Sequence, residues 1–159
     1  LKSFDKAIEI EDNETSQQLK GDIYQNYEKY SEALECYDRA IEICPYEINA
    51  FMAKARIYMQ MDDLKSAEKI FDEAEKIDAN STLFLCEKGN FYFYQERLPE
   101  AISYYDQCLK IDDENSEALL FKAISCGMLN QEKEMGKCLD KIMEVNPLLL
   151  MELDNYLRD

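Results

Sequence analysis

The composition of the chain excludes several kinds of protein before any motif is considered. Its 159 residues include 34 acidic and 18 basic side chains, so the formal net charge is −16. A chain this acidic lacks the basic surface with which nucleic-acid-binding proteins displace counterions from phosphates. Apolar runs such as Leu148–Met151 are much shorter than the roughly 20 residues that a membrane-spanning helix needs. Histidine is absent, and with it the commonest general base and metal ligand.

Helical periodicity accounts for nearly the whole chain. Apolar residues recur at intervals of three and four, as in Phe51, Ala55 and Tyr58, which places them on one helix face. Pro99 suits a first helical turn, whereas Pro45 follows a run that it cannot continue. In chain order the pattern predicts a leading helix, four helix pairs and a trailing helix, at 2–11, 14–27/30–43, 48–61/64–77, 82–95/98–111, 116–129/132–145 and 148–158. The expected N-cap residues are Asp63, Asn80, Ser81 and Ser116.

The helix pairs are copies of one unit of 34 residues. Four small residues, Gly21, Ala55, Gly89 and Ala123, follow one another at that interval. A small residue at a crossing lets two helices approach to about 8–10 Å. A single pair cannot bury its apolar face, so stacking of several pairs is expected to make a continuous core. Three further series keep the spacing: Ala33, Ala67, Ala101 and Met135; Ala40, Ala74, Cys108 and Ile142; Tyr37, Phe71, Tyr105 and Leu139.

The order of these residues resembles the tetratricopeptide repeat (TPR) family. The segment Tyr30–Pro45 is similar to the second helix of that repeat, and the likeness covers nearly the whole chain. The resemblance implies an all-α fold, a right-handed α-α superhelix (TPR solenoid) of antiparallel helix hairpins with a concave groove. It also implies a non-catalytic scaffold that binds a peptide or a partner helix. We therefore expect a single array with a truncated repeat, four full repeats and a C-terminal capping helix, at 1–13, 14–47, 48–81, 82–115, 116–147 and 148–159.

The resemblance assigns the concave face to the first helix of each repeat. Its residues grade from polar to apolar toward the C-terminus, and methionine and aromatic side chains suit an apolar or amphipathic partner. The predicted binding residues are Met52, Arg56, Met59, Cys86, Asn90, Phe93, Tyr94, Leu120, Ile124 and Met128. Relatives that clamp an acidic chaperone tail carry lysine, asparagine and arginine on these helices. The matching positions here include Asp22, Glu87 and Glu117, which would repel an acidic tail, so such a clamp is not expected. The alternative is that the capping helix or a neighbouring chain covers this face.

Two series of opposite charge run along the predicted helices. Lysines recur in the first helices and aspartates in the second helices, at Lys20, Lys54, Lys88 and Lys122 and at Asp5, Asp38, Asp72, Asp106 and Asp140. Residues equidistant from a turn lie level in an antiparallel hairpin, so Lys54 is expected to lie level with Asp72 and with Asp38. We favour a structural series of ion pairs over a charged surface that binds a ligand, although individual surface pairs are weak.

The remaining motifs favour an interaction protein over an enzyme. The six cysteines include no C-x-x-C pair, which favours free, mostly buried thiols in a reducing, cytoplasmic compartment. No phosphate loop, nucleophile elbow or EF-hand spacing is present, so we expect no catalysis, no cofactor and no metal. The expected function is a protein–protein interaction scaffold for a protein or peptide, with neither nucleic-acid binding nor membrane insertion, and with self-association left open. The alternative is a regulatory or oligomerisation segment of a larger protein whose activity lies elsewhere.

Overall fold

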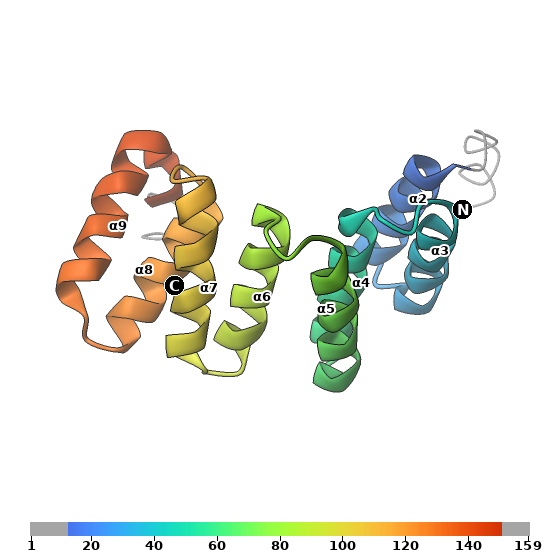
Figure 1. Cartoon of the computed structure of the whole chain (residues 1–159), viewed down its shortest axis with the longest axis horizontal. Coiled ribbons are helices and arrows are strands. Elements are labelled where there is room, and N and C mark those ends of the chain that lie inside the picture. Colours follow the sequence, from blue (N-terminus) through green and yellow to red (C-terminus); the bar gives the residue numbers. More distant parts are fainter. Residues whose placement is uncertain (1–12, 151–159) are drawn as a thin grey trace. The chain divides into compact units, whose positions relative to one another are not determined.

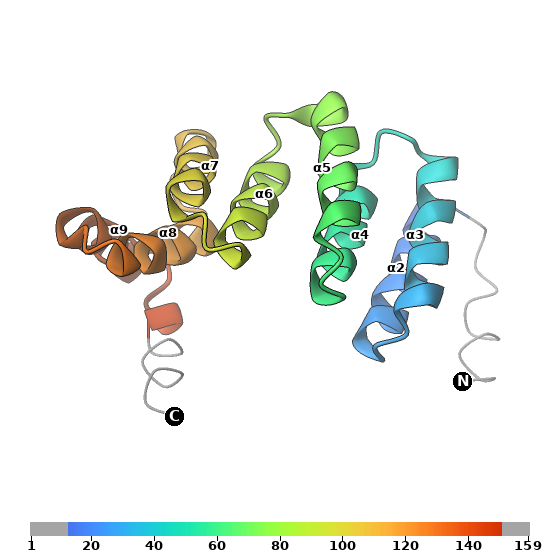
Figure 2. The ribbon, with the colours of Figure 1, turned by 90° about the horizontal axis from the view of Figure 1, so that it is seen from below.

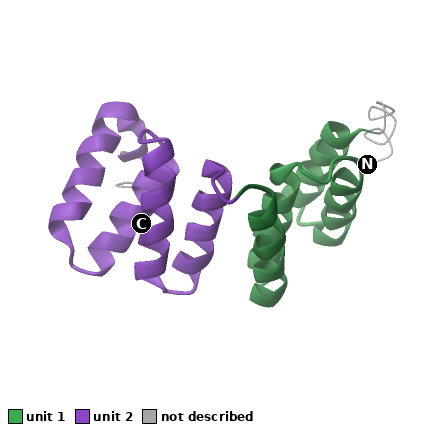
Figure 3. Cartoon of the chain, viewed as in Figure 1, with its two compact units in different colours: residues 1–78 green, residues 79–159 purple. Residues whose placement is uncertain are grey.

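The computed structural model describes residues 13–150, and every regular element in that range is an α-helix. The chain divides into two compact units, residues 1–78 and residues 79–159 (Figure 3). Unit 1 holds the helices α2 (Glu14–Asn26), α3 (Tyr30–Ile43), α4 (Ile48–Gln60) and α5 (Leu64–Asp78) (Figure 1). Unit 2 holds α6 (Thr82–Tyr94), α7 (Leu98–Ile111), α8 (Ser116–Met128) and α9 (Glu132–Val145) (Figure 2).

Each unit therefore consists of two consecutive helix hairpins, as the periodicity predicts. The predicted helix ends agree with the structure to within one residue for all eight helices. The predicted helix at 2–11 and most of the predicted capping helix lie outside the described residues, although residues 147–150 are helical. The division into the six predicted segments stays a prediction.

The N-caps are partly as expected. Asp63 and Ser81 accept hydrogen bonds from the backbone N–H groups of Ser66 and Phe84, so Ser81 and not Asn80 caps α6. The expected cap at Ser116 is wrong, because the Asn115 side chain accepts from the Ala118 N–H at 3.0 Å and Ser116 is the first residue of α8. Asparagine and serine both suit an N-cap, so residue type alone does not discriminate between Asn115 and Ser116.

The turn inside every described hairpin has one residue in the left-handed backbone region. These residues are Glu28, Asp62, Glu96 and Asn130, with φ between 56° and 58°. In each turn the next residue donates its N–H to a carbonyl five positions earlier, at 2.8–3.0 Å. This is the hydrogen-bond pattern of a Schellman motif, which normally takes glycine at the left-handed position. The 34-residue spacing thus extends to the turns, without the residue type that usually marks them.

The small-residue series lies where the first and second helices of a hairpin cross. A Cβ atom added at Gly21 would lie 2.6 Å from Cε1 of Tyr37, and one added at Gly89 would lie 2.5 Å from Cε1 of Tyr105. Both tyrosines are fully buried. Most members of the alanine and aromatic series are likewise buried, with exposed fractions of 0 % for Ala33, Tyr37, Ala40, Ala67, Phe71, Ala74, Ala101, Tyr105 and Cys108, whereas Met135 and Leu139 of the last hairpin are half-buried. The predicted core is confirmed at the buried positions.

Ion pairs connect the two hairpins inside each unit. Lys54 of α4 pairs with Asp38 of α3, and Lys122 of α8 pairs with Asp106 of α7 at 2.6 Å. In both pairs the lysine reaches back to the aspartate of the preceding second helix, which confirms the predicted structural role of these two lysines. The lysine side chains are mostly buried and the aspartates are about half exposed. Their stems therefore add packing to the charge interaction.

Candidate functional site

In unit 2, aromatic rings of α6 and α8 meet on the predicted binding face. Phe93 contacts Phe121 edge to face, with ring centroids 5.3 Å apart and an interplanar angle of 70°. Tyr94 contacts Phe93 in the same way at 6.1 Å, and 66 % of its surface is exposed. Ile124 and Met128 follow Phe121 at helical spacing, and Met128 is 56 % exposed. We call Phe93, Tyr94, Phe121, Ile124 and Met128 the aromatic face.

Tyr105, Asn90 and Glu117 form a hydrogen-bonded network next to this face, in which Tyr105 and Asn90 are buried and Glu117 is exposed. The Tyr105 hydroxyl donates to Oδ1 of Asn90 at 2.9 Å, and Nδ2 of Asn90 donates to Oε1 of Glu117 at 2.9 Å. The Tyr105 ring stacks on Phe121 with centroids 6.3 Å apart. Burial, followed by the charges of Cys86 and Glu117, raises the pKa of Tyr105, so its hydroxyl remains a donor. The network holds α6, α7 and α8 in register and fixes the position of Phe121.

Three of the ten predicted binding residues are buried. Asn90 uses both its amide oxygen and its amide nitrogen in the network. The Cys86 thiol is hydrogen-bonded to the Cys108 thiol. This bond, followed by burial, raises the pKa of Cys86. Met52 has no exposed surface. In this structure all three side chains contribute to packing, and a direct role in binding stays a prediction.

The unit 1 part of the predicted face is polar. Arg56 is exposed and Met59 is half-buried. Neighbouring side chains are joined by hydrogen bonds: Nε2 of Gln25 donates to Gln60 at 3.3 Å, and the Tyr37 hydroxyl donates to Asp22 at 2.6 Å. Burial, then this bond, raises the pKa of Tyr37. On these first helices of unit 1, the structure shows an exposed Arg56 and a half-buried Met59 near polar side chains that are hydrogen-bonded to one another.

Sequence reasoning missed Phe121, which joins the two helices of the aromatic face. The predicted positions were offsets from Ala123 taken from the family, and Phe121 lies between two of them, Leu120 and Ile124. Leu120 instead packs partly buried against the core cluster of α8 and α9. The helical spacing from Phe121 to Ile124 and Met128 was the signal that could have identified it.

Three features of the described residues concern metal ligands, membrane-spanning helices and cysteines. Among residues 13–150, no group of three or more cysteine, aspartate and glutamate side chains is arranged to hold a metal ion. In the same range no helix combines the length and apolarity needed to cross a bilayer. All six cysteines are free, and Cys86, Cys108, Cys126 and Cys138 are buried, as expected from their spacing.

Comparison with known families adds an assignment that the geometry alone does not give. Residues 7–150 match the family described as the intraflagellar transport protein 70 (IFT70) C-terminal domain. The chain belongs to this family. The comparison of this chain with curated protein sequences found no match.

Solved structures confirm the fold of this IFT70 C-terminal domain. PilF of Pseudomonas aeruginosa matches with a TM-score of 0.76 and 18 % identity, over 84 % of this chain and 61 % of PilF. MamA of Desulfovibrio magneticus matches with a TM-score of 0.68 and 15 % identity, over 86 % of this chain and 77 % of MamA. The first TPR of Spaghetti (RPAP3), solved with the HSP90 peptide SRMEEVD, matches with a TM-score of 0.64 and 24 % identity, over 74 % of this chain and 93 % of that domain. The predicted TPR family and the all-α fold of successive hairpins are confirmed.

Proposed function

We propose that this chain is a non-catalytic binding module that receives an apolar or amphipathic peptide or helix on the aromatic face of unit 2. The observation that carries the proposal is the contact of Phe93 with Phe121 across α6 and α8, beside the exposed side chains of Tyr94 and Met128. Aromatic side chains contribute large contact areas at a low cost in conformational entropy, and methionine adapts to partners of different shape. An amphipathic helix laid along such a face would bury its own apolar side chains against them.

The charges near the face favour an apolar partner over an acidic chain end. Glu117 accepts a hydrogen bond from Asn90 and lies four residues before Phe121 on α8, with its side chain exposed. A carboxylate approaching this point would meet a like charge, a repulsion that solvent weakens at an exposed site. We therefore do not extend to this chain the acidic HSP90 peptide with which the RPAP3 domain was solved.

The family assignment supports a proposal about the biological setting of the module. The chain matches the C-terminal domain of intraflagellar transport protein 70, which supports its being one part of a larger protein. We propose that its partner is another component of the intraflagellar transport machinery. The runner-up function, a regulatory or oligomerisation segment of that larger protein, draws support from the same assignment.

Paired substitutions test the proposal. The purified chain serves as bait in an extract of ciliated cells, and the bound proteins are identified by mass spectrometry. Phe93→Ala combined with Ile124→Ala should abolish capture of the specific partner while circular dichroism stays unchanged. The control, Ile111→Ala combined with Met143→Ala, removes two exposed apolar side chains of unit 2 outside the aromatic face, and it should retain the partner. Equal capture by both double variants would refute the aromatic face as the binding site.

Light scattering separates the runner-up from the leading proposal. If the aromatic face joins two copies of the chain, the wild-type molar mass should rise with concentration and the Phe93→Ala, Ile124→Ala variant should remain a monomer. A wild-type chain that is monomeric throughout would leave the oligomerisation function without support.

A further inference from the structure

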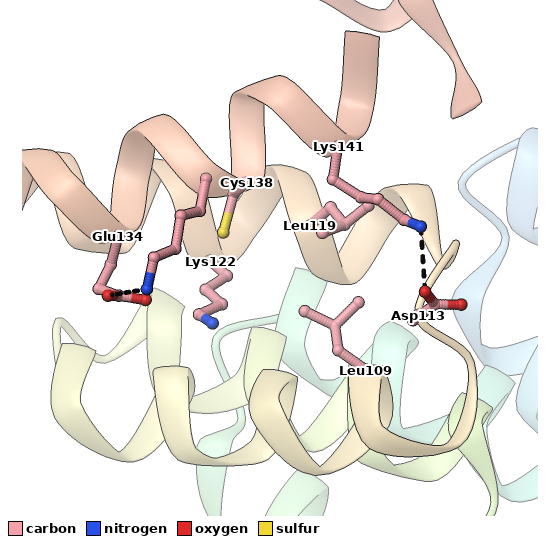
Figure 4. Close-up of a pocket in the computed structure, with 8 residues that line it drawn as sticks. Leu109, Asp113, Leu119, Lys122, Glu134, Cys138 and Lys141 are labelled. Carbon is pink, nitrogen blue, oxygen red and sulfur yellow. Dashed lines mark hydrogen bonds and ion pairs between the residues drawn. The ribbon is translucent and has the colours of Figure 1, made fainter. Parts of the chain in front are cut away.

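A second concave site lies on unit 2, between α7, α8 and α9. It is a cavity of about 240 Å³ with an apolar floor and charged walls (Figure 4). The floor is formed by Leu109 of α7, Leu119 of α8 and Cys138 of α9, and the walls by Asp113, Lys122, Glu134, Lys137 and Lys141. We call these eight residues the lysine pocket. Pockets for drug-sized molecules are usually about 300–1,000 Å³, so this one suits a single side chain of a larger partner.

The lysine pocket is separate from the aromatic face. Successive residues of a helix are rotated by roughly 100° about its axis. On α8, the pocket residues Leu119 and Lys122 therefore point roughly 150° away from Phe121, Ile124 and Met128. A ligand in the pocket would leave the aromatic face free, and the two sites can be tested independently.

Comparison of the two units shows why unit 2 has room here. The positions 68 residues before Leu119 and Cys138 hold Phe51 and Ile70, which are larger and are buried in unit 1. Replacing them with leucine and cysteine removes side-chain volume from the floor. The position that corresponds to Lys141 is Glu73, so the wall of the pocket also carries a different charge in unit 2.

The lining of the pocket has a small excess of basic groups in an acidic chain. It contains three lysines and two carboxylates, in a chain with a net charge of −16, and Lys122 is itself paired with Asp106, which lies outside the lining. Lys137 binds Glu134 at 2.7 Å and Lys141 binds Asp113 at 3.0 Å. Each ammonium group has three N–H donors, so it can bind a second carboxylate beside the one it holds. The side chains of Lys137 and Lys141 are 61 % and 30 % exposed, which leaves them accessible.

We propose that the lysine pocket binds an acidic segment of a partner protein, with one leucine-sized side chain on the apolar floor and flanking carboxylates on Lys137 and Lys141. These lysines are four residues apart, about 6 Å along the helix axis, a distance that flexible glutamate side chains on both sides of a leucine can reach. The leucine supplies apolar burial, and the flanking glutamates supply charge-assisted hydrogen bonds. This site goes beyond the proposed function, because it lies on another face and takes a partner of opposite character.

A fluorescent peptide with the core Glu-Glu-Leu-Glu-Glu serves as the probe, and fluorescence anisotropy measures its binding to the whole chain. Lys137→Glu and Lys141→Glu should each weaken binding about tenfold. Cys138→Ile, which introduces the residue that unit 1 carries at this position, should also weaken it by filling the floor. The matched control Lys133→Glu changes an exposed lysine of the same helix that does not line the pocket, and it should change affinity less than about twofold.

Four results would overturn the proposal. One is equal loss of binding in Lys133→Glu, which would indicate a general charge effect. The second is unchanged binding of a peptide with serine in place of leucine, which would remove the apolar floor from the argument. The third is self-association of the chain that Lys137→Glu abolishes, which would assign the pocket to a second copy. The fourth is loss of probe binding in the Phe93→Ala, Ile124→Ala variant, which would place the peptide on the aromatic face instead.

Discussion

Replacing Gly89 with alanine would ordinarily stabilise a helix, but here we expect it to destabilise the chain. Gly89 lies in the interior of α6, and alanine in a helix interior is favoured over glycine by about 0.5–1 kcal/mol. The new Cβ atom, however, would lie 2.5–3.0 Å from three ring atoms of Tyr105. That ring cannot move aside easily, because its hydroxyl is bound to Asn90 and its face stacks on Phe121.

The net effect follows from two opposing magnitudes. Overpacking of a well-packed core typically costs about 1–3 kcal/mol, which exceeds the gain in helix propensity. The difference corresponds to a net loss of about 1 kcal/mol in the free energy of unfolding. Gly136, in the interior of α9, is the matched control, because a Cβ atom added there would have no neighbour within 4 Å. The same substitution at Gly136 should raise the free energy of unfolding by about 0.5–1 kcal/mol.

Urea denaturation followed by circular dichroism measures both variants against the wild type. The expected midpoints lie below the wild-type value for Gly89→Ala and above it for Gly136→Ala. Adding Tyr105→Leu to Gly89→Ala copies the Ala123 and Leu139 combination of the last hairpin, so the double variant should lose less free energy of unfolding than the sum of the losses of the two single variants. If Gly89→Ala stabilises the chain as much as Gly136→Ala does, α6 and α7 can separate at no cost and the close-approach argument fails.

Four further substitutions test other parts of the structure. Tyr105→Phe should lower the free energy of unfolding, measured in urea, by about 1–2 kcal/mol, because it leaves the buried Asn90 oxygen without its donor. Tyr37→Phe should lower it less, because the acceptor of the Tyr37 hydroxyl, Asp22, is exposed. Glu96→Gly should raise the free energy of unfolding by about 0.5–1 kcal/mol by relieving a left-handed backbone; an unchanged melting temperature would contradict this. Hydrogen bonds from Ser66 lower the pKa of Asp63 in the folded chain. The Asp63 carboxylate therefore stabilises the fold at a pH above its pKa in the unfolded chain, about 4. This stabilisation is lost as the pH falls through the lower pKa of the folded chain. The melting temperature of the wild type should therefore exceed that of Asp63→Asn at pH 7, and this gap should close in acid.

The positions of the helices could be predicted from the sequence because several independent signals coincide. The apolar spacing and the small-residue series agree on every hairpin, and both ends of each of the eight described helices were predicted to within one residue. The backbone conformation of the turns was harder to predict. Their left-handed residues, such as Glu28 and Asp62, are not glycines, so composition gave no marker for the conformation.

The binding face was harder to predict, because an offset along the sequence does not determine how far a helix is rotated toward its neighbours. That rotation decides that Met52 is buried and Arg56 is exposed on the same helix. Asn90 looked like a polar contact for a ligand, but its partner Tyr105 lies on the next helix and its partner Glu117 on the one after. The lysine pocket depends on missing volume at Cys138, which appears only when three helices are placed together.

Some side-chain contacts repeat over 68 residues. The first hairpin of each unit crosses at a glycine packed on a tyrosine, whose hydroxyl binds the residue after that glycine, Asp22 or Asn90. The second hairpin of each unit has alanine at the crossing, and its lysine pairs with the aspartate of the helix before it. A hairpin of the first type therefore supplies the aspartate that a hairpin of the second type uses, once in each unit.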